Sequence, residues 1–147
     1  MYEKFGFYTK RLRVLKAHEE DAQEISKLYR NQSAKQRRVI ESNWRRELRK
    51  AAEDFYRDVT YLVKDKSNKL IGIVETESED GETVNIGIWF PNKAKETSYL
   101  NELVDSMIEW SQTDEYKTIS GIQRIDKINP SGVMATDIKG KIILSAS

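Results

Sequence analysis

A short polar segment between two patterned runs is the part of the sequence best suited to chemistry. Residues 84–90 alternate between apolar and other side chains, which is typical of a β-strand. Pro91 cannot donate a hydrogen bond to a strand ladder and so predicts the end of that strand. Apolar side chains at three- and four-residue steps over residues 100–110 predict a helix. The turn between them, Asn92–Tyr99, would present free backbone N–H groups and the positive end of a helix dipole, which together favour a bound anion such as phosphate.

The side chains of this turn both support and weaken an anion site. Lys95 adds a positive charge, and Ser98 is small enough to let a phosphate approach the backbone and can donate its hydroxyl. Glu96 would repel a phosphate unless its carboxylate points to solvent. The alternative is an ordinary connection between a strand and a helix, in which Thr97 or Ser98 caps the helix.

A second concentration of charge covers residues 33–50. Its cations are Lys35, Arg37, Arg38, Arg45, Arg46, Arg49 and Lys50. Seven cations against two carboxylates, Glu41 and Glu47, give the segment a formal charge of +5. One interpretation is a patch for an acidic partner or for RNA. The alternative is the solvated face of a long helix, supported by Glu–Arg pairs at four-residue spacing.

The composition narrows the possible classes of protein. The 147 residues suffice for a core, and we expect a single domain over residues 1–147. A net charge of +1 provides no bulk attraction to nucleic acid or to a membrane. The absence of cysteine excludes disulfides, thiolate metal sites and cysteine nucleophiles, and with His18 as the only histidine we expect no metal site. No apolar run is long enough for a membrane span or a signal core, so we expect a cytoplasmic location.

Regular secondary structure must position the polar turn. The spacing of apolar residues along the chain predicts a mixture of strands and helices. The predicted strands cover residues 8–16, 60–63, 70–76, 84–90 and 118–125. The predicted helices cover residues 19–31 and 33–58 and a segment that ends at Trp110. A short helix and a last strand, residues 141–144, would close the chain. The fold class is therefore α/β.

Several of these segments resemble one family. The run Ile86-Gly87-Ile88-Trp89-Phe90, the turn after it and Glu102 resemble the coenzyme A-binding region of GNAT-type N-acetyltransferases. The opening TKRLRVLKAHEEDAQEISKLY is similar to the first strand and helix of the branch that acetylates protein N-termini, such as those of ribosomal proteins, and small amines. The predicted order of elements is similar to that fold over nearly the whole chain.

The resemblance implies a GNAT-like mixed, mostly antiparallel sheet flanked by helices, with acetyl-coenzyme A as co-substrate. It places the pantetheine arm on the backbone of Ile88, Trp89 and Phe90, where the strand splays from its neighbour. The pyrophosphate would lie on residues of the turn, namely Lys95, Glu96, Thr97, Ser98, Tyr99 and Leu100. The family's turn has the pattern Gln/Arg-x-x-Gly-x-Gly/Ala; Lys95 keeps the basic position, but Ser98 and Leu100 replace the two small residues, so the motif is degenerate. Asn129 matches the start of the family's short helix and completes the predicted cofactor-binding set.

The resemblance also implies acid–base chemistry, because an amine must lose a proton to attack a thioester. The family often uses a carboxylate on the central strands as base, and here Glu75 or Glu77 would serve, directly or through water. Ser131 is the candidate acid, since it lies in the region that matches the family's short helix. The alternative for Glu75 and Glu77 is that they are solvated charges at a strand end.

The leading prediction is an acetyl-coenzyme A-dependent N-acetyltransferase that transfers an acetyl group to an amine of a small molecule or a protein by direct attack. The basic segment 33–50 would favour an acidic partner, and an open sheet edge near the C-terminal end would allow a homodimer. The main alternative is a catalytically silent GNAT-fold protein with a binding or regulatory role. A third is a module that contacts RNA or the ribosome through the basic helix.

Overall fold

The structure of the chain is a computed structural model. It describes residues 6–30, 32–53, 58–78, 82–110, 118–125, 127 and 136–137.

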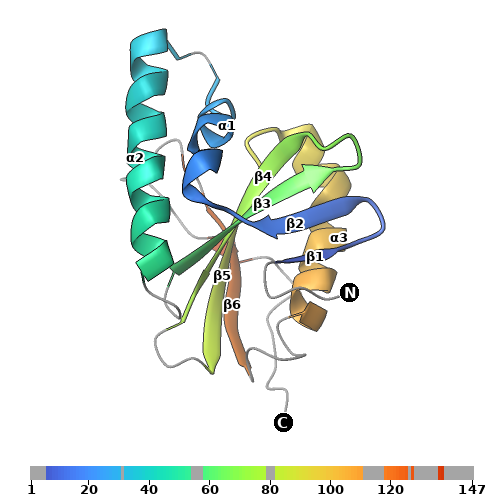
Figure 1. Ribbon diagram of the computed structural model, residues 1–147. Coiled ribbons are helices and arrows are strands. Elements are labelled where there is room, and N and C mark those ends of the chain that lie inside the picture. The colour runs from blue at the N-terminus through green and yellow to red at the C-terminus, as the bar shows by residue number, and fades with distance from the viewer. Residues whose placement is uncertain are drawn as a thin grey trace.

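One mixed sheet forms the centre of the described structure (Figure 1). Its seven strands lie in chain order: β1 Gly6–Tyr8, β2 Leu12–Lys16, β3 Asp58–Asp65, β4 Leu70–Glu77, β5 Thr83–Trp89, β6 Thr118–Arg124 and β7 Thr136–Asp137. Every neighbouring pair is antiparallel except β5 and β6, which are parallel. The predicted mixed, mostly antiparallel sheet is therefore confirmed.

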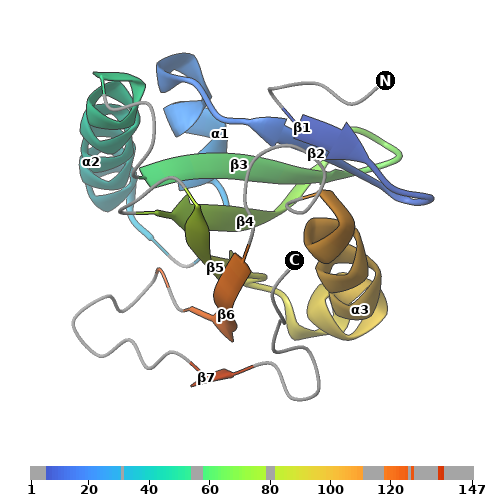
Figure 2. The same cartoon turned by 90° about the horizontal axis from the view of Figure 1, so that it is seen from below.

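Helices cover both faces of this sheet (Figure 2). The helical elements are a 3-10 turn η1 Glu19–Asp21, α1 Ala22–Ser26, α2 Ala34–Glu53 and α3 Lys93–Trp110. Helices α1 and α2 pack on one face, and α3 packs on the other (Figures 1 and 2). Two parallel strands need a long connection between them, and α3 provides it from β5 to β6.

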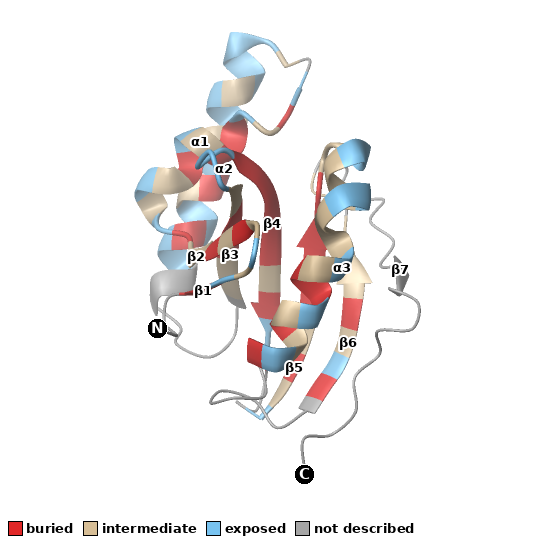
Figure 3. Cartoon of the chain, turned by 90° about the vertical axis from the view of Figure 1, so that its right-hand side faces the viewer, coloured by how far each residue is buried: buried red, intermediate tan, exposed pale blue. Residues whose placement is uncertain are grey.

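The core divides into two apolar clusters, one on each face of the sheet. On one face, Leu103, Val104 and Met107 of α3 are fully buried against the sheet. On the other face, Ile25 of α1 and Trp44 of α2 pack with sheet residues that include Trp89. Strand β4 is buried along almost its whole length, as expected for a central strand covered on both faces (Figure 3).

The N-terminal half differs from the prediction in three places. The strand predicted over residues 8–16 is two strands, β1 and β2, joined by a tight turn that the Thr9 N–H closes by donating to the Leu12 carbonyl at 2.8 Å. The helix predicted over residues 19–31 is only η1 and α1. The helix predicted over residues 33–58 is described to Glu53, and Asp58 already belongs to β3.

The C-terminal part is described only in short pieces. Strand β6 agrees with the strand predicted over residues 118–125, and β7 pairs with it within the region where a short helix was expected. The strand predicted over residues 141–144 lies outside the described residues. Among the described helices, none combines the length and the apolar character needed to cross a membrane.

Candidate active site

A cavity of ≈ 420 Å³ lies beside β4, between the sheet and helix α2. Glu75, one of the two predicted bases, reaches it from β4 with about a third of its side chain exposed. The described lining residues are Tyr29, Gln32, Ile40, Asn43, Trp44, Glu47, Glu75 and Lys127. We call this space the acceptor cavity.

Two aromatic side chains form a fixed wall of the acceptor cavity. Trp44 Nε1 donates a hydrogen bond to Tyr29 Oη at 2.9 Å, and Tyr29 Oη donates to the Lys127 carbonyl at 3.2 Å. The Tyr29 ring also packs on Trp89 of β5, with the ring centres 5.2 Å apart. Because both polar groups of the wall are satisfied, the rings are held in one orientation.

A cation already occupies part of the acceptor cavity. The Lys127 ammonium lies 3.2 Å from both Glu75 carboxylate oxygens. It also lies 5.3 Å from the centre of the Trp44 ring. A carboxylate and an aromatic face are the two groups that attract an ammonium ion most directly. The cavity therefore presents a carboxylate and an aromatic face on either side of one ammonium group.

The other predicted acid–base residues do not share this position. Glu77 lies two residues further along β4, is exposed and does not line the acceptor cavity. Ser131 and Asn129 lie outside the described residues. No group of three or more His, Cys, Asp or Glu side chains able to hold a metal ion occurs in the part of the chain that the structure describes.

The end of β5, predicted to bind the pantetheine arm, is closed by its neighbour. Ile88, Trp89 and Phe90 are all buried. Strands β5 and β6 stay paired from Thr83 to Ile88, and beyond them the Ile125 N–H donates to the Ile88 carbonyl at 2.9 Å. Pairing with β6 therefore reaches Ile88, and the Ile88 carbonyl already accepts the Ile125 N–H.

The predicted turn Asn92–Tyr99 is mostly helix. Asn92 caps α3: its side-chain oxygen accepts the N–H groups of Ala94 at 2.8 Å and Lys95 at 3.2 Å, and its carbonyl accepts the Glu96 N–H at 3.0 Å. The cap is Asn92, where the sequence suggested Thr97 or Ser98. The backbone donors expected for pyrophosphate are thus used by the cap and by the helix itself.

The side chains from Glu96 to Leu100 are also engaged. Glu96 receives a bidentate ion pair from Arg124 of β6, with Nε 2.8 Å from Oε1, and this hydrogen bond raises the pKa of Arg124. The Thr97 hydroxyl donates to the Lys93 carbonyl at 3.0 Å. The Leu100 side chain packs against the core cluster under α3. Lys95 lines a second cavity.

The turn between β1 and β2 is fastened to α3 by contacts that the sequence did not reveal. Arg11 donates to the Ser98 carbonyl at 2.6 Å and lies 4.4 Å from the centre of the Tyr99 ring. The Glu102 carboxylate accepts the Thr9 hydroxyl, the Arg11 N–H at 2.8 Å and Arg11 Nε at 2.7 Å. Burial acts to raise the pKa of Glu102, but these hydrogen bonds outweigh it and leave the pKa below its ordinary value.

The basic segment is partly neutralised within the described structure. Arg45 pairs with Glu41 at 2.9 Å, and Arg49 pairs with Glu19, whose pKa is lowered by that hydrogen bond. Arg46 is exposed on α2. The pair between residues 41 and 45 is the four-residue spacing expected for a solvated helix face.

Comparison with known proteins identifies the family. A model of the acetyltransferase (GNAT) domain matches residues 11–131, which is most of the chain. The chain belongs to the GNAT acetyltransferase family. Acetyl transfer is the activity that this membership supports, and acetyl-coenzyme A is the family's acetyl donor. No curated protein matches the sequence.

Solved structures give the same fold for this GNAT domain. A ribosomal-protein-S5-alanine acetyltransferase from Vibrio fischeri is 15% identical with a TM-score of 0.59, over 82% of this chain and 73% of that one. A spermidine N-acetyltransferase chimera from Vibrio cholerae and a human enzyme is 17% identical with a TM-score of 0.57, over 82% and 74%. A dodecameric spermidine N-acetyltransferase from Vibrio cholerae is 16% identical with a TM-score of 0.56, over 82% and 72%. At these identities the likeness shows the fold.

Proposed function

We propose that this GNAT domain is an N-acetyltransferase that binds its acceptor amine in the acceptor cavity and uses Glu75 as the base. The observation that carries the proposal is the Lys127 ammonium held between Glu75 and the Trp44 ring. That arrangement displays the recognition a substrate amine would need: a carboxylate to accept its proton and an aromatic face to hold its charge.

The chain's own residues would orient the amine and remove its proton. Acetyl-coenzyme A supplies the acetyl group as a thioester. Glu75 takes one proton from the bound ammonium group, which leaves a neutral nitrogen able to attack. That nitrogen forms the new bond to the acetyl carbon as the carbon–sulfur bond breaks, and the coenzyme A thiolate leaves and takes up the second proton that the nitrogen loses. The amine would take the place of the Lys127 ammonium, so that Tyr29 and Trp44 hold it against Glu75.

A primary amine on a small molecule or a protein is the proposed acceptor. Structural neighbours are described as acting on spermidine and on an alanine of a ribosomal protein, both of which present amines. A second carboxylate, Glu47, also lines the acceptor cavity.

A kinetic comparison of two matched variants tests this function. With acetyl-coenzyme A and a panel of primary amines, Glu75→Gln should lower kcat/KM by about 10²- to 10³-fold, the usual contribution of a positioned base. Glu77→Gln removes the same charge from an exposed residue of the same strand outside the cavity, and should retain activity. Full activity of Glu75→Gln would reject the assignment.

The closed end of β5 favours a second candidate, a GNAT-fold binding protein without catalysis. The Ile125–Ile88 hydrogen bond and the Asn92 cap occupy groups that the predicted cofactor site needs. This candidate is preferred if neither turnover nor acetyl-coenzyme A binding is found while an amine still binds in the acceptor cavity.

We further propose that residues 1–147 form one domain that works in the cytoplasm and can form a homodimer. Light scattering tests the dimer by measuring the molar mass of the protein in solution.

Exposed cations of α2, such as Arg46, would bias the partner or acceptor toward acidic molecules. The bias is tested by measuring kcat/KM for acidic and for neutral acceptors in the wild type and in Arg46→Glu. The proposed bias is rejected if the ratio of the two kcat/KM values is the same in both proteins.

A further inference from the structure

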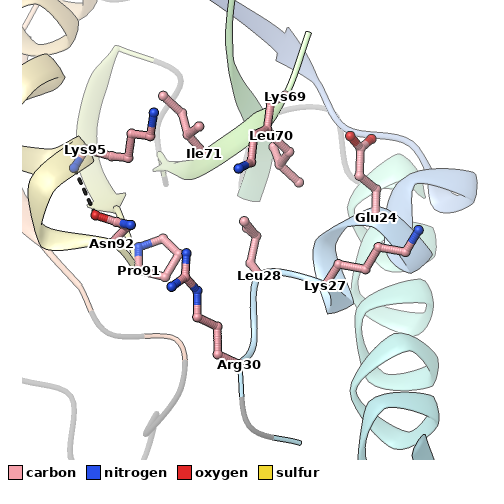
Figure 4. Close-up of a pocket in the computed structure, with 10 residues that line it drawn as sticks. All are labelled: Glu24, Lys27, Leu28, Arg30, Lys69, Leu70, Ile71, Pro91, Asn92 and Lys95. Atoms are coloured by element: carbon pink, nitrogen blue, oxygen red, sulfur yellow. Dashed lines mark hydrogen bonds between the residues drawn. The ribbon is translucent and has the colours of Figure 1, made fainter. Parts of the chain in front are cut away.

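A second cavity, of ≈ 340 Å³, lies where the end of α1, the turn before β4 and the start of α3 meet (Figure 4). Four of its lining residues are cations from these three segments. Lys27 and Arg30 follow α1, Lys69 precedes β4, and Lys95 lies in the first turns of α3. We call this space the cationic pocket.

The charges of the cationic pocket are not balanced by the described residues. Glu24 is the one described carboxylate in the lining, and its Oε1 lies 3.3 Å from Lys64 Nζ, outside the pocket. Within the described ranges no ion pair involves any of the four cations. Four like charges around one cavity repel each other, and a bound anion would relieve that repulsion.

Apolar side chains separate these cations. Leu28, Leu70 and Pro91 lie among them in Figure 4, and Leu70 is buried. A pocket with apolar walls and a few charged groups suits a ligand with an anionic head and an uncharged arm. A long polyanion is less well matched, because the chain as a whole carries only +1.

The start of α3 adds to this attraction without supplying free backbone donors. The positive end of the dipole of this 18-residue helix lies at Asn92, a lining residue, but Asn92 itself uses the N–H groups of the first turn. Glu96, the acid of the first turn, is held by Arg124 and does not line the pocket. An anion here would therefore be bound by side-chain cations.

We propose that the cationic pocket binds the diphosphate of the acetyl donor through Lys27, Arg30, Lys69 and Lys95, in place of the backbone N–H groups of the family's turn. The inference rests on the proposed function, because it takes the donor to be a phosphate ester with an uncharged arm. Leu28 lines this pocket and its neighbour Tyr29 lines the acceptor cavity, so consecutive residues of one segment line the two cavities.

Calorimetric titration with three probes tests the pocket. Coenzyme A and inorganic pyrophosphate should bind, and pantetheine, which lacks phosphate, should bind much more weakly. Lys69→Gln and Arg30→Gln should each weaken binding of both phosphate probes by about fivefold, the upper range for an exposed ion pair. Lys66→Gln is the matched control, since Lys66 is exposed in the same turn as Lys69 but does not line the pocket.

The outcomes separate this inference from the proposed function. If coenzyme A binds equally well to the wild type, Lys69→Gln and Arg30→Gln, the pocket is rejected while acetyl transfer stands. If pyrophosphate binding depends on Lys69 and Arg30 but no acceptor amine is ever acetylated, the anion site stands and the enzyme function fails. Failure of the wild type to bind either phosphate probe rejects the pocket.

Discussion

Glu102 connects two parts of the chain that lie far apart in sequence. Its carboxylate accepts hydrogen bonds from Thr9 and Arg11, 93 and 91 residues away, and so ties the turn between β1 and β2 to α3. Arg11 extends the same tie to the Ser98 carbonyl. Because the donors favour the ionised carboxylate, the pKa of Glu102 lies below its ordinary value even though burial opposes this.

Replacing Glu102 with Gln should destabilise the protein at neutral pH by about 1–2 kcal/mol, since it removes hydrogen bonds to a charged group. A depressed folded-state pKa gives stability that is present above the unfolded pKa, near about 4.3, and lost as pH falls through the folded value. The difference in unfolding free energy between wild type and Glu102→Gln should therefore shrink at acid pH.

Urea unfolding between pH 7 and pH 3 measures this difference. Glu109→Gln, at an exposed position of the same helix, serves as the control. A difference that is constant over the whole pH range would show that the Glu102 charge does not fasten the turn.

At the scale of the secondary-structure elements, one side chain determines where α3 begins. Asn92 stands directly before Lys93, and its side-chain oxygen accepts the N–H groups of Ala94 and Lys95. The helix therefore begins several residues before the apolar stripe that starts at Leu100, in a segment predicted as a turn. An Asn next to a strand-ending Pro91 was the signal available in the sequence for this start.

Asn92→Ala should destabilise the protein by about 1 kcal/mol through loss of this cap. Asn101→Ala provides the comparison, because Asn101 is exposed within the same helix and caps nothing. Thermal unfolding of the two variants should show a lower Tm for Asn92→Ala alone. Equal Tm values would mean that the helix start does not depend on the cap.

The predictable elements were those whose patterns are local. The short apolar run at residues 70–74 indicated β4, the alternation over residues 84–90 indicated β5, and the helical spacing located most of α2. The hairpin of β1 and β2 was missed because Thr9–Arg11 contains no Gly or Pro. In the candidate site, position on a central strand indicated Glu75 and Glu77 equally, and only the packing of α2 and Lys127 against the sheet distinguishes them.

At the scale of the whole molecule, the acceptor cavity and the cationic pocket lie beside a sheet that is closed between β5 and β6. The Ile125 N–H holds the Ile88 carbonyl, and the Ile125 side chain lies over Gly87. A donor whose arm binds the end of β5, as the family resemblance implies, must first displace Ile125.

The rate of hydrogen exchange at the Ile125 amide reports whether Ile125 is displaced. The amide should be protected in the free protein and exchange faster when acetyl-coenzyme A is bound, because its acceptor is then taken by the arm. The amide of Val63, in the centre of β3, gives the internal reference. Unchanged protection at Ile125 in a saturated complex would show that the arm binds elsewhere.

Calorimetric titration of the wild-type protein with acetyl-coenzyme A tests most directly whether this GNAT domain uses that compound. We predict saturable binding with a Kd in the micromolar range, about −8 kcal/mol. No detectable heat, together with no thermal shift at millimolar acetyl-coenzyme A, would contradict the claim and identify the protein as a silent member of its fold.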